Sequence, residues 1–204
     1  MSIIFLDGLE VFEIPSSSIT FGDALGEGQF GKVFEGHMMS AASTGSPLRV
    51  AVKMLGDGLD ISEQNSFLKE ALRMTKFNHP HIVRLLGVCF KETPSFIVLE
   101  HMSGGDLKQY LRDSCQDGHT APTVSHEELL EISRQIASAM VYLAEVPYVH
   151  RDIAARNVLI DGSQCYKLSD FGLCFQIVLI FNKRNQWLNF QSSIVEVIII
   201  CPSF

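Results

Sequence analysis

Alternating apolar and polar residues predict β-strands through much of the first half of the chain. From Ile19 the sequence ITFGDALGEGQFGKVFEGHM gives two β-type segments joined by a glycine-rich turn. Three more strand-like runs follow: VAVK at residues 50–53, IVRLLGVCF and SFIVLEHM. Between the first two of these runs we predict a helix, with an N-cap at Ser62 and an end near Phe77. Its apolar face comprises Phe67, Leu68, Ala71, Leu72 and Met74.

The second half of the sequence predicts two helices and then a β-hairpin. GGDLKQYLRD begins a short helix with Asp106 near its positive end. A capping box at residues 125–128 (Ser-His-Glu-Glu) opens a long helix that ends at Pro147. One side of this helix is apolar: Leu129, Ile132, Ile136, Met140 and Leu143. The stretch from Val149 to Leu173 then reads as a loop, a hairpin about an Asp161-Gly162 turn, and a second loop.

The two ends of the chain have a different character. Residues 1–18 carry no recognisable chemistry, and Pro15-Ser16-Ser17-Ser18 indicates a flexible lead into the first domain. Residues 174–204 contain the β-prone runs IVLIF and VEVIIIC, which favour aggregation when exposed. We therefore expect a lead at 1–18, a first domain at 19–103, a second at 104–173, and a hydrophobic tail at 174–204.

Composition bounds the function. The 204 residues are 47% apolar and carry a net charge of −7 without a Lys/Arg run, so we expect no nucleic-acid partner. The five cysteines include no CxxC pair, which is typical of reduced, intracellular thiols. The start lacks a secretion signal, and no run approaches the ~18 apolar residues of a membrane span. We expect a cytoplasmic chain with no membrane span.

Two carboxylates and an amide flank the predicted hairpin. Asp152 and Asn157 precede it and Asp170 follows it, so a rigid hairpin would hold three oxygen-bearing side chains at one end. Mg²⁺ takes oxygen ligands, usually one or two from protein and the rest from phosphates and water. Asn157 and Asp170 suit that role, which leaves Asp152 as a base or as a residue that orients a hydroxyl.

The glycines at 26, 28 and 31 allow three interpretations. A dinucleotide fingerprint needs a helix after its last glycine, but β-type residues follow here. A phosphate-binding P-loop matches at Gly26, Gly31 and Lys32, but its next residue must be Ser or Thr to hold Mg²⁺ and is Val33. The third interpretation is a strand-loop-strand flap whose glycines let the backbone approach ATP phosphates. A GxGxxG pattern alone is weak evidence for it.

Several motifs together resemble those of the protein kinases. His150-Arg151-Asp152, then Asn157, then Asp170-Phe171-Gly172 resemble the catalytic and metal loops of that family. GEGQFGKV followed by VAVK resembles its glycine-rich loop and ATP lysine. The resemblance covers about residues 19–173. It implies an α+β fold with an antiparallel five-stranded small lobe carrying one helix, and an incomplete helical large lobe.

The resemblance also implies roles for individual residues. Lys53, paired with Glu70, would orient the ATP phosphates, Asp152 would accept the substrate proton, and Arg156 would offset charge. Asn157 and Asp170 would bind Mg²⁺. The remaining ATP-binding positions would be Gly26, Glu27, Gly28, Gly31, Val33, Ala51, Leu99, Glu100, Met102 and Leu159, with Leu99 at the back of the adenine pocket and the backbone of residues 100–102 bonding adenine.

The catalytic loop indicates a class within this family. Serine/threonine kinases usually place a Lys two residues after the catalytic Asp, where this chain has Ala154. Arg156, two positions after Ala154, would supply the positive charge in place of that lysine. This arrangement resembles the receptor type of protein-tyrosine kinase. The implied partners are ATP and protein tyrosine substrates or a partner kinase.

The resemblance stops after Leu173. Kinases stack an apolar column through the positions of Met74, Leu85, His150 and Phe171, anchored on a later helix that we do not find in residues 174–204. We therefore expect weak or no phosphotransfer, and an uncovered apolar side on the long helix unless the tail packs there. The alternatives are a non-catalytic nucleotide-binding or partner-binding fragment, and an unstable product.

Overall fold

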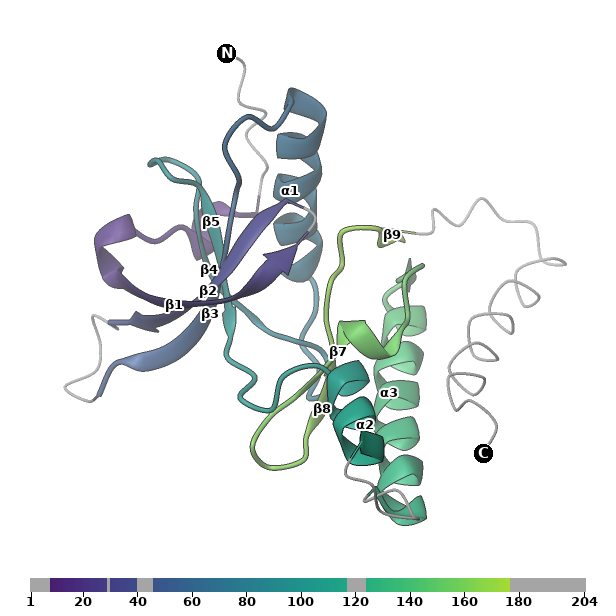
Figure 1. The fold of residues 1–204 in the computed structure, drawn as a ribbon. Coiled ribbons are helices and arrows are strands. Elements are labelled where there is room, and N and C mark those ends of the chain that lie inside the picture. The colour runs from purple at the N-terminus through teal and green to yellow at the C-terminus, as the bar shows by residue number, and fades with distance from the viewer. Residues whose placement is uncertain (1–7, 29, 40–45, 117–123, 177–204) are drawn as a thin grey trace, which may run out of the picture. The chain divides into compact units, whose positions relative to one another are not determined.

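The computed structural model describes residues 8–28, 30–39, 46–116 and 124–176 of the chain. The chain divides into two compact units, and each contains segments that are apart in sequence (Figure 1). The first comprises Met1–Asn78 and Arg84–His101, and the second comprises His79–Val83 and Met102–Phe204.

The first unit is an antiparallel five-stranded sheet with one helix, as predicted (Figure 1). The spatial order is β1-β2-β3-β5-β4. The elements are β1 (Ile19–Gly28), β2 (Gly31–Met38), β3 (Leu48–Met54), α1 (Ile61–Met74), β4 (Leu85–Cys89) and β5 (Phe96–Glu100). Two 3₁₀ turns, Glu10–Phe12 and Ser16–Ser18, precede β1.

Side-chain alternation gives the sheet two different faces. One face carries the apolar core, to which β3 contributes Val50 and Val52 and β5 contributes Phe96 and Val98, all fully buried. Residues between these positions on each strand point to the other face, because successive side chains of a strand alternate. Gly36 of β2 is required on the core face, since a Cβ there would lie 2.9 Å from Val52 Cγ2.

The segment before β1 packs on the sheet, so our prediction of a flexible lead is wrong for its described part. Glu13 forms a parallel bridge with Val88, and the Ile14 N–H donates to the Val88 carbonyl at 2.8 Å. Ile14 also packs against the apolar core. Ser16 donates to Glu92 from both its backbone N–H and its hydroxyl. Residues 13–16 therefore cover the sheet as part of the first unit.

Helix α1 begins two residues earlier than predicted, because Asp60 rather than Ser62 is its N-cap. The Asp60 side chain accepts from the Glu63 N–H at 2.8 Å, and Glu63 accepts in return from the Asp60 N–H at 2.9 Å. This reciprocal capping box satisfies two backbone donors at the helix start. The helix ends at Met74, and Phe77 lies beyond it.

The second unit contains the two predicted helices and the predicted hairpin (Figure 1). Its elements are α2 (Leu107–Gln116), α3 (His126–Glu145), β6 (Tyr148–Val149), a 3₁₀ turn at Ala155–Asn157, β7 (Val158–Ile160), β8 (Tyr166–Leu168) and β9 (Phe175–Gln176). The hairpin is β7 with β8, and β6 pairs with β9. The buried side of α3 comprises Ile132, Gln135, Ile136, Ala139, Met140 and Leu143.

Two backbone features position this unit's loops. Asp161 Oδ1 accepts hydrogen bonds from the N–H groups of Ser163 and Cys165, which closes the predicted turn of the hairpin. Glycine at position 104 permits a close approach, because a Cβ there would lie 3.0 Å from the Ile160 carbonyl oxygen, tighter than most Cβ contacts. The Gly104 N–H donates to that carbonyl at 2.8 Å, which fixes the segment before α2 to the hairpin.

The predicted capping box of α3 is only half formed. The Ser125 hydroxyl accepts from the Glu128 N–H at 3.1 Å. The Glu128 carboxylate, however, accepts from the hydroxyl groups of Tyr110 at 2.7 Å and Tyr166 at 2.6 Å. Burial and this carboxylate raise the pKa of Tyr166 well above its usual value. Glu128 therefore joins α2, α3 and β8 instead of completing the cap.

Residues His79–Val83 lie beside β8 in the second unit. Ile82 forms a parallel bridge with Leu168, the Val83 N–H donates to the Leu168 carbonyl at 2.9 Å, and the Leu168 N–H donates to the His81 carbonyl at 2.9 Å. His79 stacks on Tyr142 of α3, with 5.1 Å between ring centroids. This short segment thus lies next to β8 as a third chain beside the β7–β8 hairpin.

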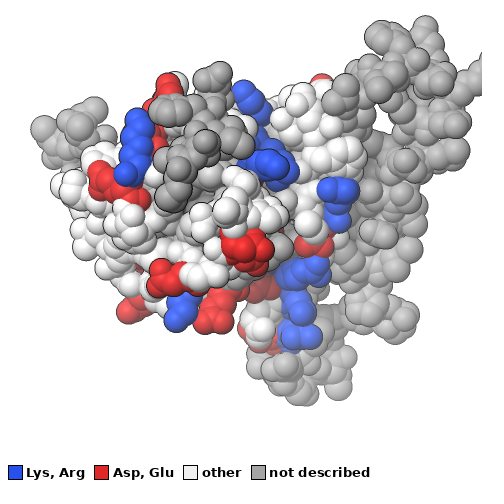
Figure 2. All heavy atoms as spheres, turned by 90° about the horizontal axis from the view of Figure 1, so that it is seen from above, with Lys and Arg blue, Asp and Glu red and all other residues white. Residues whose placement is uncertain are grey.

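Charged residues of both signs are interspersed on the face seen in Figure 2. Ion pairs of the described residues include Arg49 with Glu35 in the first unit, with 2.6 Å between Nε and Oε1, and Arg134 with Glu131 in the second, with 2.6 Å between Nη2 and Oε1. Within the described residues, none of the helices combines the length and the hydropathy needed to cross a membrane.

Candidate nucleotide and catalytic site

The sheet face opposite the apolar core carries the positions expected around adenine. In the strand register, Val33 of β2 pairs with Lys53 of β3, and Ala51 of β3 pairs with Leu99 of β5. Lys53 and Ala51 alternate with the core residues of β3, so they point to the opposite face. Val33, Ala51 and Leu99 are half-buried there. The structure thus brings these four predicted residues together on one surface.

Lys53 forms a buried ion pair with Glu70 of α1. The Lys53 Nζ lies 2.7 Å from Glu70 Oε1 and 2.8 Å from Oε2. The two residues are 8% and 1% exposed. The predicted pairing is therefore present, and it fixes the ammonium group on the same face as Ala51.

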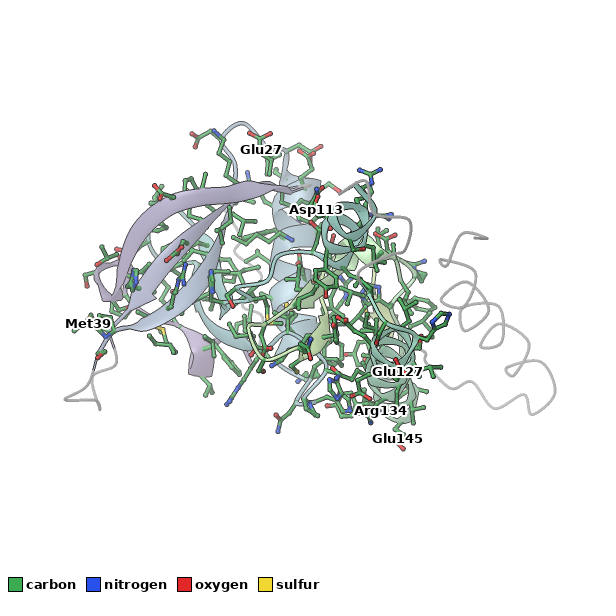
Figure 3. All side chains as sticks on the ribbon, turned by 60° about the horizontal axis from the view of Figure 1, so that its bottom comes forward. Glu27, Met39, Asp113, Glu127, Arg134 and Glu145 are labelled. Atoms are coloured by element: carbon green, nitrogen blue, oxygen red, sulfur yellow. The ribbon has the colours of Figure 1, made fainter. Side chains whose placement is uncertain are left out.

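In the glycine-rich turn between β1 and β2, backbone conformation and close packing against other backbone atoms require glycine at position 31. Gly31 has φ of +142°, and a Cβ there would lie 2.3 Å from the Met54 carbonyl oxygen. At Gly26, by contrast, a Cβ would meet nothing within 4 Å. Packing does not explain that glycine, whereas close approach of a ligand to the backbone would. Glu27 lies near the end of β1, at the outer end of this hairpin (Figure 3).

Phe30 has a role in this turn that was not predicted from the sequence. Its side chain is 4% exposed and its ring makes an edge contact with Phe67 of α1, with 6.0 Å between centroids. The Lys53 ammonium lies 5.4 Å from the Phe30 centroid, within the range of a cation–π contact. An aromatic residue inside a glycine-rich turn was the available signal, because such turns usually carry small or polar residues.

In the second unit, the hairpin brings the predicted catalytic and metal residues to one end. Val158 pairs with Leu168, so Asn157 and Ser169 are adjacent just beyond the paired strands. The Ser169 N–H and hydroxyl both donate to the Asn157 carbonyl, at 2.8 and 2.9 Å. These bonds join the catalytic loop to the segment that carries Asp170.

Both carboxylate oxygens of Asp152 accept hydrogen bonds from its own loop. Arg156 Nη2 donates to Oδ1 at 2.5 Å, and Asn157 Nδ2 donates to Oδ2 at 2.8 Å. Asn157 Nδ2 also donates to the Asp152 carbonyl at 2.7 Å. The amide nitrogen is thus fully used, so Oδ1 of Asn157 is the amide atom that can serve as a metal ligand.

His150 supports this loop from inside the unit. It is 2% exposed, and its Nε2 lies 3.0 Å from the Ser169 carbonyl, which requires that Nε2 carries the proton. Its Nδ1 then accepts from the Asp152 N–H at 3.3 Å. Burial lowers the pKa of His150, which favours this neutral form. The ring also contacts Phe171, with 4.8 Å between centroids.

Asp170 follows β8 in a strained backbone conformation. Its φ is +62°, a left-handed region that non-glycine residues adopt rarely and that often marks functional sites. Its carboxylate is exposed and accepts from the Gly172 N–H at 3.4 Å. Among the described residues, no group of three His, Cys, Asp or Glu side chains could hold a metal. Asn157 and Asp170 fit Mg²⁺, which completes its shell with phosphate oxygens and water.

The predicted site residues divide between the two units. The first unit contains Gly26, Glu27, Gly28, Gly31, Val33, Ala51, Lys53, Glu70, Leu99 and Glu100. The second contains Met102, Asp152, Arg156, Asn157, Leu159 and Asp170. Met102 is buried, Leu159 is half-buried on β7, and Glu100 Oε1 accepts from the Arg84 N–H at 2.7 Å. That both sets bind one nucleotide stays a prediction.

The fold and these two sets of residues define a protein kinase. The family model described as protein tyrosine and serine/threonine kinase matches residues 19–189, which runs past Leu173, where we expected the resemblance to stop. This chain belongs to that family. Protein kinases use ATP with Mg²⁺.

Individual relatives indicate a branch of the family. The chain is 41% identical over 170 residues to "Tyrosine-protein kinase transforming protein ros" of UR2 avian sarcoma virus, covering 80% of this chain and 42% of that protein. It is 41% identical to "Proto-oncogene tyrosine-protein kinase ROS" of Gallus gallus, covering 80% of this chain and 7% of the relative. It is also 41% identical to "Leukocyte tyrosine kinase receptor" of Mus musculus, covering 81% and 19%. The chain thus spans less than half the length of each of these tyrosine kinases.

Proposed function

We propose that the chain binds ATP with Mg²⁺ and that its site residues serve transfer of the γ-phosphoryl group to a tyrosine hydroxyl of a protein substrate, at a rate that we expect to be weak or nil. The observation that carries this proposal is the network at the end of the β7–β8 hairpin. There Asn157 bonds the carboxylate of Asp152, and Ser169 bonds the backbone of Asn157 immediately before Asp170. Oxygen ligands and a carboxylate base are thus held together by bonds within one unit.

In this proposal the first unit binds the nucleotide. Lys53, fixed by Glu70, donates to the α- and β-phosphates, and the backbone near Gly26 approaches the phosphates where no side chain intervenes. The half-buried residues Val33, Ala51 and Leu99 provide an apolar surface for adenine. The backbone of residues 100–102 provides the hydrogen bonds to adenine.

In the second unit, Asn157 Oδ1 and the Asp170 carboxylate hold Mg²⁺, which neutralises phosphate charge when bound. Asp152 accepts the proton of the tyrosine hydroxyl as its oxygen bonds to the γ-phosphorus. The bond from that phosphorus to the β–γ bridging oxygen breaks, and ADP leaves with that oxygen. The Arg156 guanidinium, already 2.5 Å from Asp152 Oδ1, offsets negative charge at the acceptor.

Tyrosine is the proposed acceptor for two reasons. Ala154 stands where serine/threonine kinases carry a lysine, and the cation comes instead from Arg156. The relatives named above are tyrosine kinases. We place the reaction in the cytoplasm, where ATP and reduced thiols occur, with protein tyrosine substrates or a partner kinase as macromolecular partners.

The test measures thermal unfolding of the full chain with no ligand, with ATP, and with ATP plus Mg²⁺. Ligand at 100 times its Kd should stabilise the chain by about 2.7 kcal/mol. Asp170→Asn should abolish the part of the shift that depends on Mg²⁺. Asp113→Asn is the matched control, because Asp113 is an exposed carboxylate of α2 (Figure 3). Absence of any shift with Mg-ATP would refute the nucleotide site.

A second measurement separates binding from transfer. The chain is incubated with Mg-ATP and a tyrosine peptide, and phosphotyrosine is measured for the wild-type chain and for Asp152→Asn. Transfer that depends on Asp152 supports the kinase assignment. A Mg-ATP shift without transfer would instead identify a non-catalytic nucleotide-binding chain.

A further inference from the structure

A carboxylate in the segment before β1 holds the chain that leaves β4. Glu13 Oε1 accepts hydrogen bonds from the backbone N–H groups of Phe90 at 3.1 Å and Lys91 at 2.9 Å. Both residues directly follow β4, which ends at Cys89. Glu13 itself is held in place, because its backbone forms a parallel bridge with Val88 of β4. A charged acceptor with two backbone donors therefore fixes the start of the β4–β5 connection.

Phe90 belongs to a row of three aromatic rings. Its ring makes an edge contact with Phe67 of α1, with 6.0 Å between centroids, and Phe67 makes a second edge contact with Phe30, also at 6.0 Å. Phe67 is fully buried and contacts both of the other rings. Protein interiors are close-packed, so a displacement of one ring is transmitted to its neighbours. The bonds of Glu13 to the backbone of Phe90 thus bear on the packing of α1.

The row of rings ends at the lysine proposed to bind phosphate. Phe67 and Glu70 are three residues apart on α1, so they share one face of the helix. Lys53 Nζ lies 2.7 and 2.8 Å from the carboxylate oxygens of Glu70 and 5.4 Å from the Phe30 centroid. Phe67 therefore supports both partners of the ammonium group, Glu70 through the helix and Phe30 through ring contact. All of these residues belong to the first unit.

We propose that Glu13 is a positioning residue for the Lys53 ammonium group, acting through Phe90 and the packed rings instead of through contact with a nucleotide. While Glu13 holds the backbone of Phe90, the rings support α1 and the Lys53–Glu70 pair stays closed. Loss of the Glu13 carboxylate lets the pair open more often, and ATP phosphates then lose an aligned cation. The closing of the pair is independent of nucleotide, whereas its effect on ATP rests on the proposed function.

The reactivity of the Lys53 amine tests the first step without any ligand. The full chain is treated with limiting acetic anhydride, and mass spectrometry measures the acetylation of each lysine. A buried ammonium group that is paired with Glu70 reacts slowly. Relative to the exposed Lys108 of α2, Glu13→Ala should speed acetylation of Lys53 about tenfold, as expected for the loss of one or two hydrogen bonds. Glu10→Ala is the matched control, because Glu10 is an exposed carboxylate in the same segment, and it should leave this ratio unchanged.

Two more variants test the route from Glu13 to Lys53. Glu13→Gln keeps an oxygen acceptor, so it should increase the acetylation of Lys53 less than Glu13→Ala does. Phe90→Leu keeps the N–H group that Glu13 binds but removes the ring, and it should increase the acetylation by itself. Both changes interrupt one route, so Glu13→Ala should add little in the Phe90→Leu background, and additive effects would overturn the proposal. Circular dichroism checks that each variant is folded, and Phe90→Leu decides if Glu13→Ala does not fold.

Titration calorimetry with ATP and with adenosine tests the second step. Glu13→Ala should weaken ATP binding about tenfold through the misplaced cation, and it should leave adenosine binding unchanged because adenosine has no phosphate for Lys53. Equal weakening of both ligands would overturn the positioning role. A wild-type chain that binds neither ligand would refute the proposed nucleotide site, and acetylation would then decide on Glu13 alone. Equal acetylation of Lys53 in Glu13→Ala and Glu10→Ala, or faster acetylation of every lysine in Glu13→Ala, would overturn the inference.

Discussion

Removing one charge of the Lys53–Glu70 pair should destabilise the first unit far more than removing both. The side chains of these residues are 10% and 2% exposed, and their charged atoms lie 2.7 Å apart. A buried charge left without its partner costs about 3–5 kcal/mol. Since domains unfold at about 5–15 kcal/mol, Lys53→Met or Glu70→Leu alone should remove a large fraction of the stability.

The double variant distinguishes this reasoning from a simple loss of contacts. Lys53→Met combined with Glu70→Leu leaves no charge behind, and apolar replacements of similar volume often match a buried ion pair in stability. The free energy of unfolding should therefore return close to the wild-type value. Urea titration of the ligand-free chain by circular dichroism measures it, and hydrogen exchange shows whether the loss is confined to the first unit.

Arg49→Met is the matched control for this experiment. Arg49 pairs with Glu35 on the same sheet, with 2.6 Å between Arg49 Nε and Glu35 Oε1, but water screens this exposed pair. Its loss should change stability little. The reasoning fails if a single substitution at Lys53 or Glu70 has no larger effect than this control, or if the double variant is as unstable as the single ones.

Three further predictions follow from the described backbone and side chains. Gly31→Ala should destabilise the first unit because a Cβ collides with backbone, whereas Gly26→Ala should leave unfolding unchanged and weaken only ATP binding, as measured by titration calorimetry. Asp60→Ala should cost about 1 kcal/mol by urea denaturation through the lost cap, and Ser62→Ala should cost much less. Burial lowers the pKa of His150, so the stability that depends on its neutral form is present above pH 6.5 and is lost as the pH falls. The free energy of unfolding, measured by urea denaturation at several pH values between about 7 and 5, should therefore decrease as the pH falls. His150→Gln should make this decrease smaller.

The sequence was sufficient to predict the strands, the hairpins and the pairing of Lys53 with Glu70. In β3, Val50 and Val52 alternate with Ala51 and Lys53, so local periodicity alone separates the apolar core from the face that carries the lysine. The Asp161-Gly162 turn likewise fixed which residues end the hairpin together. These features depend on neighbours within a few positions, which sequence patterns represent well.

The misses depend on partners far along the chain. Asp60 and Ser62 are both good N-caps, and local chemistry does not choose between them. Glu128 matches a capping box, but Tyr166, 38 residues away, bonds its carboxylate in the folded unit. Ile14 follows a stretch without periodicity. The residues that it packs against include members of β3, β4 and β5, which lie far along the chain. Contacts of this kind are set by tertiary structure.

The assignment of His79–Val83 to the second unit has a practical consequence for dissecting the molecule. A recombinant fragment that stopped at His101 would retain these five residues but lose β8. The Val83 N–H would then lack its Leu168 acceptor, and the His81 carbonyl would lack its donor. Neither half can therefore be excised with one cut, and attempts to express the sheet alone should include a replacement for the missing strand.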